Sequence, residues 1–472
     1  MEQVIVGAMP LDVLEPVLGE SRFRGFADVA SKAAAALHGR AVVNVNSTAT
    51  GGGVAEMLPT LLAYARGVDI DVRWLVIYGG ADFFTVTKRV HNNIYGVHGD
   101  GGELGRAQRR LYEKTLQPQV EDLLTMVQPS DVVILHDPQT LGLAPMLRRA
   151  RVPVVWRCHI GADGTNDYTE RGWRFLAPYL EAVDLLVVSR KSFAPPGFPA
   201  DRVVVIPPSV DPLAVKNVDL DAATVDRLLA YTGLIQGRNG GPPTYQRRDG
   251  SPARVDRQAD VLQLGPPPPP DAPLVVQVSR WDALKDMAGV LTAFAEHVDG
   301  TTDAHLLLVG PNVTGVADDP ESVAVFEDCS ERWRALPHAE RRRVHLACLP
   351  TADTEENAVI VNALQRRATV VAQKSLAEGF GLTVIEAMWK NKPVVASAVG
   401  GIVDQITDDG CGSLIEDPHD LAAFGAAVRR LLDDPELPAK IGAAAHERAR
   451  EFLPDVHLTR WAELLTSLPR AD

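Results

Sequence analysis

The stretch QKSLAEGFGLTVIEAMWKNKPVVAS, from Gln373 to Ser397, contains one full repeat of the pattern that organises this chain. It joins the apolar run 368–373 to the apolar run 392–398 through a glycine-rich turn and an amphipathic segment. Apolar runs of this length are typical of parallel strands that are buried on both faces. The stretch therefore predicts a strand, a helix and a second parallel strand, with Glu378 and Glu386 flanking the turn.

The same alternation occurs in two sets along the chain. The predicted strands are 41–47, 71–78, 131–137, 152–158 and 184–189 in the first set, and 273–279, 304–310, 343–349, 368–373 and 392–398 in the second. Each set predicts a doubly wound parallel sheet in an α/β fold. Two such Rossmann-like domains that face a cleft bind ligands at the carboxyl ends of their strands.

The predicted organisation has an N-terminal domain over residues 1–215, a second domain over 216–452, and a C-terminal helix, 453–472, that crosses back to the first domain. Two domains suit a chain of 472 residues, because one hydrophobic core rarely spans that length. Residues 237–272 are rich in Gly, Pro and charge, so we expect an irregular insert there.

Composition narrows the classes of partner. The net charge is −14, from 47 basic and 61 acidic residues, which argues against nucleic acid. No apolar run is long enough to cross a bilayer, so no membrane partner is expected. The N-terminus has no readable secretory signal, and the 4 cysteines have no metal or disulfide spacing. A cytoplasmic location follows as the expectation.

Three consecutive glycines, Gly51, Gly52 and Gly53, follow the first strong strand and lead into a helix. Glycines permit close backbone approach, and a helix start offers unpaired N–H groups to an anion such as phosphate. The spacing matches neither the dinucleotide-binding pattern nor the P-loop. A tight turn without a ligand is the alternative.

Two cations, Arg280 and Lys285, come directly after the first strand of the second set. Arg offers a planar fork of donors and Lys a point charge, which together suit a diphosphate. Taken alone they could be two solvated cations in a loop. Their position at the carboxyl end of a strand favours the functional interpretation.

The turn in the opening stretch combines a phosphate site with hydroxyl ligands. It consists of Gly379, Phe380 and Gly381, followed by Leu382 and Thr383 at the start of the helix. The N–H groups at that start suit a phosphate, and the carboxylates of Glu378 and Glu386 suit the hydroxyls of a sugar or ribose. As an alternative, Glu386 only complements the helix dipole, worth about 0.3–1 kcal/mol.

The chain as a whole resembles a known family. The matching stretches are NSTATGGGVAEML (46–58), FFTVTKRVHNNIYG (83–96), LHDPQTLGL (135–143), WRCHIGAD (156–163), PPSVDPL (207–213), QVSRWDALKD (277–286), 362–390 and VGGIVDQI (399–406). In this order they resemble the trehalose glycosyltransferring synthases, which are retaining GT-B glycosyltransferases of the glycogen-synthase-like superfamily. The main departure is the proline run near 264–270, which lies away from every matched stretch.

The resemblance implies roles on the donor side. Glu386 would hold the nucleotide ribose, and Glu378 with the 379–381 turn would contact the donor sugar. Arg280 and Lys285 would neutralise the departing diphosphate. His159 would lie against the donor sugar near the anomeric centre, although a lone histidine after a strand is more often structural.

On the acceptor side, the resemblance implies binding by residues of the first domain. These are Lys88, Asn92, His136, Asp137, Gln139 and Asp163. The implied partners are NDP-glucose (UDP, ADP or GDP), glucose and trehalose, with a homodimer as the assembly. No Asp pair follows a strand where it could hold a diphosphate through a metal, so no metal site and no required cofactor are predicted, with Mg²⁺ at most stimulatory.

The implied reaction joins NDP-glucose to glucose, giving α,α-trehalose and NDP with retention. It is a reversible transfer by a hexosyltransferase. Three alternatives remain open from the sequence. They are a retaining trehalose phosphorylase that uses glucose 1-phosphate, a related transferase with another acceptor, and a sugar-nucleotide sensor without turnover.

Overall fold

The computed structural model describes residues 1–49, 53–237, 240–298, 302–313 and 320–469. Gly51 and Gly52 of the predicted phosphate loop therefore lie outside the described residues, whereas Gly53 begins a helix. The chain divides into an N-terminal unit, Met1–Ser209 with Phe452–Asp472, and a C-terminal unit, Val210–Glu451. The sequence had placed these boundaries at 215 and 452.

The N-terminal unit contains a seven-stranded sheet in the order β1-β3-β2-β4-β5-β6-β7. Its strands are β1 (Glu2–Val4), β2 (Val42–Asn46), β3 (Val72–Val76), β4 (Val132–His136), β5 (Val154–Cys158), β6 (Leu185–Val188) and β7 (Val203–Val205). All neighbours are parallel except β1, which pairs antiparallel with β3. β2 and β4 are buried along their whole length, as expected of central strands covered on both faces.

Helices cover both faces of this sheet. They are α1 (Glu15–Leu18), α2 (Glu20–Ala36), α3 (Gly53–Arg66), α4 (Ala81–Ile94), α5 (Arg106–Met126), α6 (Asp137–Thr140), α7 (Ala144–Arg149), α8 (Asp167–Leu180) and α18 (Pro454–Ser467). One core, which includes Phe83, Tyr112 and Phe175, packs α4, α5 and α8 on one face. The other core packs α3 and α18 on the opposite face.

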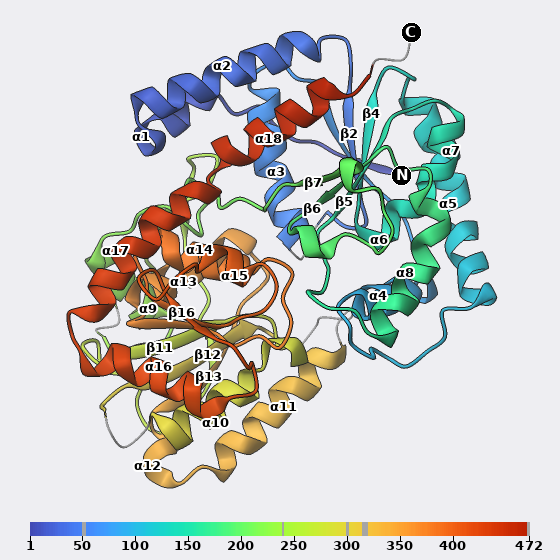
Figure 1. Ribbon diagram of the computed structural model, residues 1–472. Coiled ribbons are helices and arrows are strands. Elements are labelled where there is room, and N and C mark those ends of the chain that lie inside the picture. Colours follow the sequence, from blue (N-terminus) through green and yellow to red (C-terminus); the bar gives the residue numbers. More distant parts are fainter. Residues whose placement is uncertain (50–52, 238–239, 299–301, 314–319, 470–472) are drawn as a thin grey trace. The chain divides into compact units, whose positions relative to one another are not determined.

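The last helix belongs to the N-terminal unit. α18, drawn in red in Figure 1, packs against α2. Arg22 of α2 holds Asp455 through Nε at 2.6 Å and Nη2 at 2.8 Å. Asp455 is 6% exposed, and a paired fork of this kind is stronger than a single contact. This contact therefore fixes the chain's final helix to an early one.

The C-terminal unit contains a second seven-stranded sheet, in the order β10-β13-β12-β11-β14-β15-β16. Its strands are β10 (Asp260–Leu262), β11 (Leu274–Val278), β12 (His305–Pro311), β13 (Val344–Leu349), β14 (Val370–Gln373), β15 (Val394–Ser397) and β16 (Ser413–Ile415). Only β10 is antiparallel to its neighbour. The ten strands predicted from the sequence are all present across the two units.

The helices of the C-terminal unit alternate with these strands. They are α9 (Ala222–Tyr231), α10 (Met287–His297), α11 (Pro320–Ala335), α12 (His338–Arg341), α13 (Thr354–Arg367), α14 (Leu382–Trp389), α15 (Ile402–Gln405), α16 (Leu421–Asp433) and α17 (Leu437–Ala449). α10 packs against α11 and α16, whereas α13 packs against α9 and α14 against α17. None of the described helices is long and apolar enough to cross a bilayer.

The insert expected to be irregular has order of its own, which corrects the prediction. β8 (Thr244–Gln246) and β9 (Pro252–Arg254) form a hairpin, and β10 extends the sheet along β13. Ion pairs hold the insert in place, because Arg247 contacts Asp353 and Glu355 at the start of α13. Composition predicted an irregular insert, and it did not reveal these charged contacts.

Candidate active site

The loop after β11 carries the first group of site residues. Arg280 donates from Nη2 to Asp282 Oδ2 at 2.8 Å, and Asp282 Oδ1 accepts from the backbone N–H of Leu284 at 2.9 Å. This second contact caps the short turn Ala283–Lys285 and thereby fixes the position of the Lys285 backbone. The Arg280 side chain is half-exposed, whereas that of Lys285 is 18% exposed. The loop thus presents one accessible and one sheltered cation.

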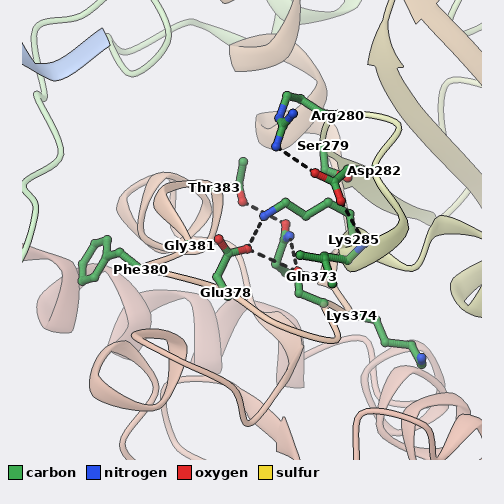
Figure 2. A network of polar contacts seen from close by, with 12 residues as sticks. Ser279, Arg280, Asp282, Lys285, Gln373, Lys374, Glu378, Phe380, Gly381 and Thr383 are labelled. Carbon is green, nitrogen blue, oxygen red and sulfur yellow. Dashed lines mark hydrogen bonds and ion pairs between the residues drawn. The ribbon is translucent and has the colours of Figure 1, made fainter. Parts of the chain in front are cut away.

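Lys285 meets Glu378, although 93 residues separate them in the chain. Its Nζ lies 2.5 Å from Glu378 Oε2, and Ser375 Oγ donates to the same oxygen at 3.2 Å. Figure 2 shows the two charged side chains pointing toward each other. The cation expected to bind diphosphate and the carboxylate expected to bind the donor sugar therefore share one site.

The Gly-Phe-Gly turn depends on a second glycine pair. Gly381 has φ of 84°, and as N-cap it begins α14 in the left-handed region that favours glycine. Gly400, with φ of +53°, lies so close that an added Cβ would stand 1.7 Å from the Glu378 carbonyl oxygen. The N–H of Gly401 donates to Gly379 O at 2.9 Å. Gly400 and Gly401 belong to the VGGIVDQI stretch, to which the sequence argument had assigned no role.

Leu382 and Thr383 form the first turn of α14, where backbone N–H groups have no partner within the helix. Thr383 Oγ1 bonds Gln373 Oε1 at 2.8 Å, and Gln373 Nε2 donates to Ser375 Oγ at 2.9 Å. Gln373 ends β14, so the helix start is tied to the carboxyl end of that strand. A phosphate at this point would meet the positive end of the helix dipole.

A second lysine, Lys374, lies beneath the site. Its side chain is fully buried and pairs with Asp286, the N-cap of α10. Figure 2 shows this side chain directed away from Glu378. A buried charge is tolerated only when it is paired. Lys374 is therefore a structural cation, which the sequence argument had not singled out.

Glu386 lies on α14 and is 5% exposed. Its Oε1 is 3.1 Å from Lys216 Nζ, whereas its Oε2 has no hydrogen-bond partner within the described part of the chain. A buried carboxylate oxygen without a donor costs free energy, about 1–3 kcal/mol. The arrangement leaves one oxygen for a hydroxyl of a bound ligand.

The N-terminal unit brings three predicted residues together at the ends of β4 and β5. His136 Nδ1 lies 3.1 Å from His159 Nε2, and His136 Nε2 lies 3.0 Å from Asn44 Oδ1. Because Asn44 Oδ1 only accepts, His136 donates from Nε2 and accepts at Nδ1 from His159. His159 Nδ1 is then an acceptor. Asn44, which the sequence argument missed, sets the direction of these hydrogen bonds.

Burial keeps these histidines neutral. It lowers the pKa of His136 from 6.5 to about 3 and lowers the pKa of His159 well below its ordinary value. Burial also raises the pKa of Asp137 from 3.8 to about 6, although Asp137 Oδ1 accepts from the backbone N–H of His159 at 2.8 Å. The site thus offers neutral donors and acceptors beside one carboxylate.

A cavity lies under this histidine pair, within the N-terminal unit. Its walls come from α3, α18 and the sheet, and they include His136, Arg157, His159, His457 and Trp461. The rest of the lining is mostly aliphatic. A sugar needs many convergent polar groups, so this largely aliphatic space does not suit a sugar.

The remaining acceptor predictions fall on neighbouring elements. α4, which carries Lys88 and Asn92, packs against α6, which contains Asp137 and Gln139. Lys88 is exposed and Asn92 is partly buried. Asp163 pairs with Arg190 and accepts from Ser192 Oγ at 2.9 Å. The structure groups His136, Asp137 and His159, and it places Asp163 in an ion pair of its own.

Within the described ranges, no three His, Cys, Asp or Glu side chains gather as a metal site would require. The free cysteines are all buried in the core. Asp318 and Asp319, one of several acidic pairs in the sequence, lie outside the described residues.

Two doubly wound units, with paired cations and a glycine turn at the carboxyl ends of the second sheet, define a GT-B glycosyltransferase. A solved structure described as "Trehalose-6-phosphate from E. coli bound with UDP-2-fluoro glucose" shares this fold, with a TM-score of 0.67 and 13% identity over 91% of this chain and all (100%) of that one.

The sequence comparisons define the family more narrowly. Residues 44–195 match "Trehalose synthase, N-terminal domain", and residues 265–448 match "Glycosyl transferases group 1". The trehalose synthase of Pyrococcus horikoshii is 33% identical over 98% of this chain and 97% of its own length. A trehalose phosphorylase of Pleurotus pulmonarius is 25% identical over 90% of this chain and 57% of its own. The chain belongs to the trehalose synthase family and is a hexosyltransferase of trehalose metabolism.

Proposed function

We propose that the protein transfers a glucosyl group from a nucleoside diphosphate glucose to the anomeric hydroxyl of glucose. The products are α,α-trehalose and the nucleoside diphosphate, and the configuration at the donor carbon is retained. The reaction is reversible, so substrate concentrations set its direction. The C-terminal unit binds the donor and the N-terminal unit binds the acceptor.

The buried oxygen Oε2 of Glu386, unpartnered among the described residues, is the observation that carries this proposal. A ribose hydroxyl is a suitable donor to a buried carboxylate oxygen that has no other partner in the described structure. A phosphorylase, whose donor is glucose 1-phosphate, has no ribose for this oxygen to bind. The 33% identity to a trehalose synthase supports the same choice, as does the UDP-2-fluoro glucose bound to the structural relative.

Charge on the leaving group is the main demand of the donor step. The bond between the glucosyl carbon and the diphosphate oxygen breaks, and its electron pair stays on the diphosphate. Arg280, Lys285 and the N–H groups of Leu382 and Thr383 stabilise that charge electrostatically. Removing one such contact typically costs about 10²–10³ in rate.

The acceptor step uses neutral groups. His159, at the donor sugar, accepts from a hydroxyl of that sugar at Nδ1. The proton of the glucose anomeric hydroxyl passes to the departing phosphate oxygen as the new bond forms on the same face. Glu378 already bonds Lys285 and Ser375, so we assign it to the donor hydroxyls and not to nucleophilic attack. A covalent glucosyl ester found on Glu378 of the wild-type protein would contradict this assignment.

No metal is required in this scheme, because protein cations take the place that Mg²⁺ holds elsewhere. We propose a cytoplasmic homodimer that keeps its activity in EDTA and gains modestly from Mg²⁺. Loss of turnover in EDTA that only Mg²⁺ restores would overturn the cofactor part of the proposal.

The test is a parallel incubation of the purified protein with glucose and UDP-, ADP- or GDP-glucose, with glucose 1-phosphate as a fourth donor. Trehalose and released NDP or phosphate are measured. We expect trehalose from a nucleotide donor, and a loss of about 10²–10³ in kcat/KM on Lys285→Ala. The matched control is Lys440→Ala, since Lys440 is exposed on α17 and touches none of the site residues described above.

Each other outcome identifies a different alternative. Trehalose made only from glucose 1-phosphate would establish a phosphorylase. NDP release only with another acceptor, such as a fructose or inositol phosphate, would keep the donor site and overturn the acceptor assignment. Absence of turnover together with NDP binding would indicate a sensor.

A further inference from the structure

Two lysines from different parts of the C-terminal unit converge on Glu386. Lys216 lies in the segment before α9 and reaches Glu386 Oε1 at 3.1 Å. Lys390 follows Glu386 by one helical turn and donates to its backbone carbonyl oxygen at 3.1 Å. Lys390 is 3% exposed, so its charge is enclosed by protein.

The Lys390 ammonium is fully satisfied by neutral oxygens. It donates to Asn217 Oδ1 and Gln365 Oε1, each at 2.8 Å, and to the Glu386 carbonyl. An ammonium has three donors, so these three acceptors complete its shell. Lys390 thereby connects α14, α13 and the residue next to Lys216 in one network.

The chain on both sides of Lys216 is fastened to α13. Asn362 Nδ2 donates to Val215 O at 3.0 Å and to Val218 O at 2.9 Å. Arg366 Nη2 donates to Val218 O at 2.9 Å. A solvated lysine needs no such framework, and an exposed ion pair would contribute only about 0–1 kcal/mol. The framework therefore indicates that the position of Lys216 matters.

We propose that Lys216 is a specificity residue for the ribose of the nucleotide donor and that Lys390 is the residue that positions it. Lys216 holds one oxygen of Glu386, so the other oxygen points to a ribose hydroxyl, and the ammonium stands beside the neighbouring hydroxyl of the same diol. This inference rests on the proposed nucleotide donor.

The test compares three ligands by titration calorimetry. They are the nucleoside diphosphate that the wild-type protein binds best among UDP, ADP and GDP, its 2′,3′-dideoxy counterpart, and pyrophosphate. For Lys216→Met we expect about tenfold weaker binding of the diphosphate, which is about 1.4 kcal/mol, and an unchanged affinity for pyrophosphate. The wild-type preference for the ribose over the dideoxyribose should nearly vanish.

Lys390→Met should give the same pattern through Glu386 and raise KM for the sugar nucleotide while kcat changes less than twofold. A purely structural role would lower stability without changing the preference for ribose. Should this variant fail to fold, Asn217→Ala removes one acceptor of Lys390 and should give a weaker form of the same pattern. Lys440→Met is the matched control, with no expected change.

The outcomes separate the inference from the proposed function. Equal losses for the diphosphate and for pyrophosphate in Lys216→Met would show general charge attraction and overturn the inference alone. An unchanged ribose preference would do the same. If the wild-type protein binds no nucleoside diphosphate, the proposed function and the inference both fall.

Discussion

The candidate sites of the two units solve the burial of polar groups in opposite ways. In the C-terminal unit, the site is built from ion pairs, namely Arg280–Asp282, Lys285–Glu378, Lys374–Asp286 and Lys216–Glu386. In the N-terminal unit, the corresponding ends of the strands carry a neutral chain of His136, His159 and Asn44. The unit to which we assign the charged diphosphate therefore holds its site charges in ion pairs. In the unit to which we assign neutral glucose, the site histidines are neutral.

This difference has one physical origin. Taking a charge out of water is costly, so a buried group either finds a counter-ion or gives up its charge. Lys216, Lys285 and Lys374 meet carboxylates in the C-terminal unit, whereas burial lowers the pKa of His136 and His457 to about 3 in the N-terminal unit. The comparison predicts that acid will act on the N-terminal unit first.

The largest expected effect is acid destabilisation of the N-terminal unit. Between pH 6.5 and 3 the unfolded chain binds protons at His136 and His457 that the folded unit does not, so the free energy of unfolding falls as pH falls. From pH 7 to pH 5 the loss is about 2 kcal/mol per histidine. Asp137, with its pKa raised to about 6, binds a proton in the folded unit at a higher pH than in the unfolded chain. It therefore raises the free energy of unfolding by about 1 kcal/mol over the same interval.

Amide hydrogen exchange at pH 7 and pH 5, corrected for the intrinsic rate, measures this acid destabilisation of each unit. In the C-terminal unit burial lowers the pKa of one histidine, His345, to about 3. Because the N-terminal unit has two histidines of this kind, we expect the C-terminal unit to lose less free energy of unfolding. We expect β2 and β4 to lose protection before β11 and β14 do. His457→Gln should lower stability at pH 7 and flatten the dependence on pH. Loss of protection in β11 and β14 before β2 and β4 would contradict the contrast between the two units.

The next effect concerns the buried cation of the C-terminal unit. Lys374→Met leaves the Asp286 carboxylate without its partner in a partly buried place, and we expect a loss of about 3 kcal/mol in the free energy of unfolding of this unit. Urea unfolding followed by hydrogen exchange in β14 measures it. The double variant Lys374→Met, Asp286→Asn should recover part of the loss, because Asn also caps a helix. A single-variant effect below about 0.5 kcal/mol would mean that the pair is not needed.

Much of this architecture follows from the sequence. Continuous apolar runs identify buried parallel strands, and residues directly after such strands gather at one edge of the sheet, which is why Arg280 and Lys285 were predicted as site residues. The family resemblance added Glu378 to them. The contact between Lys285 and Glu378 required only that β11 and β14 be neighbours, as they are. Short strands in a polar insert, such as β10, lack a continuous apolar run, because a strand at the edge of a sheet needs few apolar residues.

The missed residues share a different property. Lys216, Lys374 and Asn44 act through partners that are distant in the chain, and nothing in their local sequence distinguishes them from solvated side chains. Gly400 is required by close approach of another segment, and that approach exists only in the folded unit. Pairwise contacts of this kind depend on register and packing, which one sequence without a structure does not specify.

The smallest effect tests the neutral half of the comparison. His136→Phe removes the acceptor of His159 Nε2 and the donor to Asn44, so His159 loses its fixed tautomer, and we expect kcat to fall about tenfold with little change in KM for the donor. His136→Asn is the matched variant, because its side-chain oxygen can replace Nδ1, and it should lose about half as much in free energy of activation. Since the pKa of His136 is about 3, the wild-type rate should show no acid limb from this residue between pH 6 and pH 8. A limb near pH 6.5 that disappears in His136→Phe would show that the histidine is charged in the working enzyme, and the contrast between a charged donor half and a neutral acceptor half would then fail.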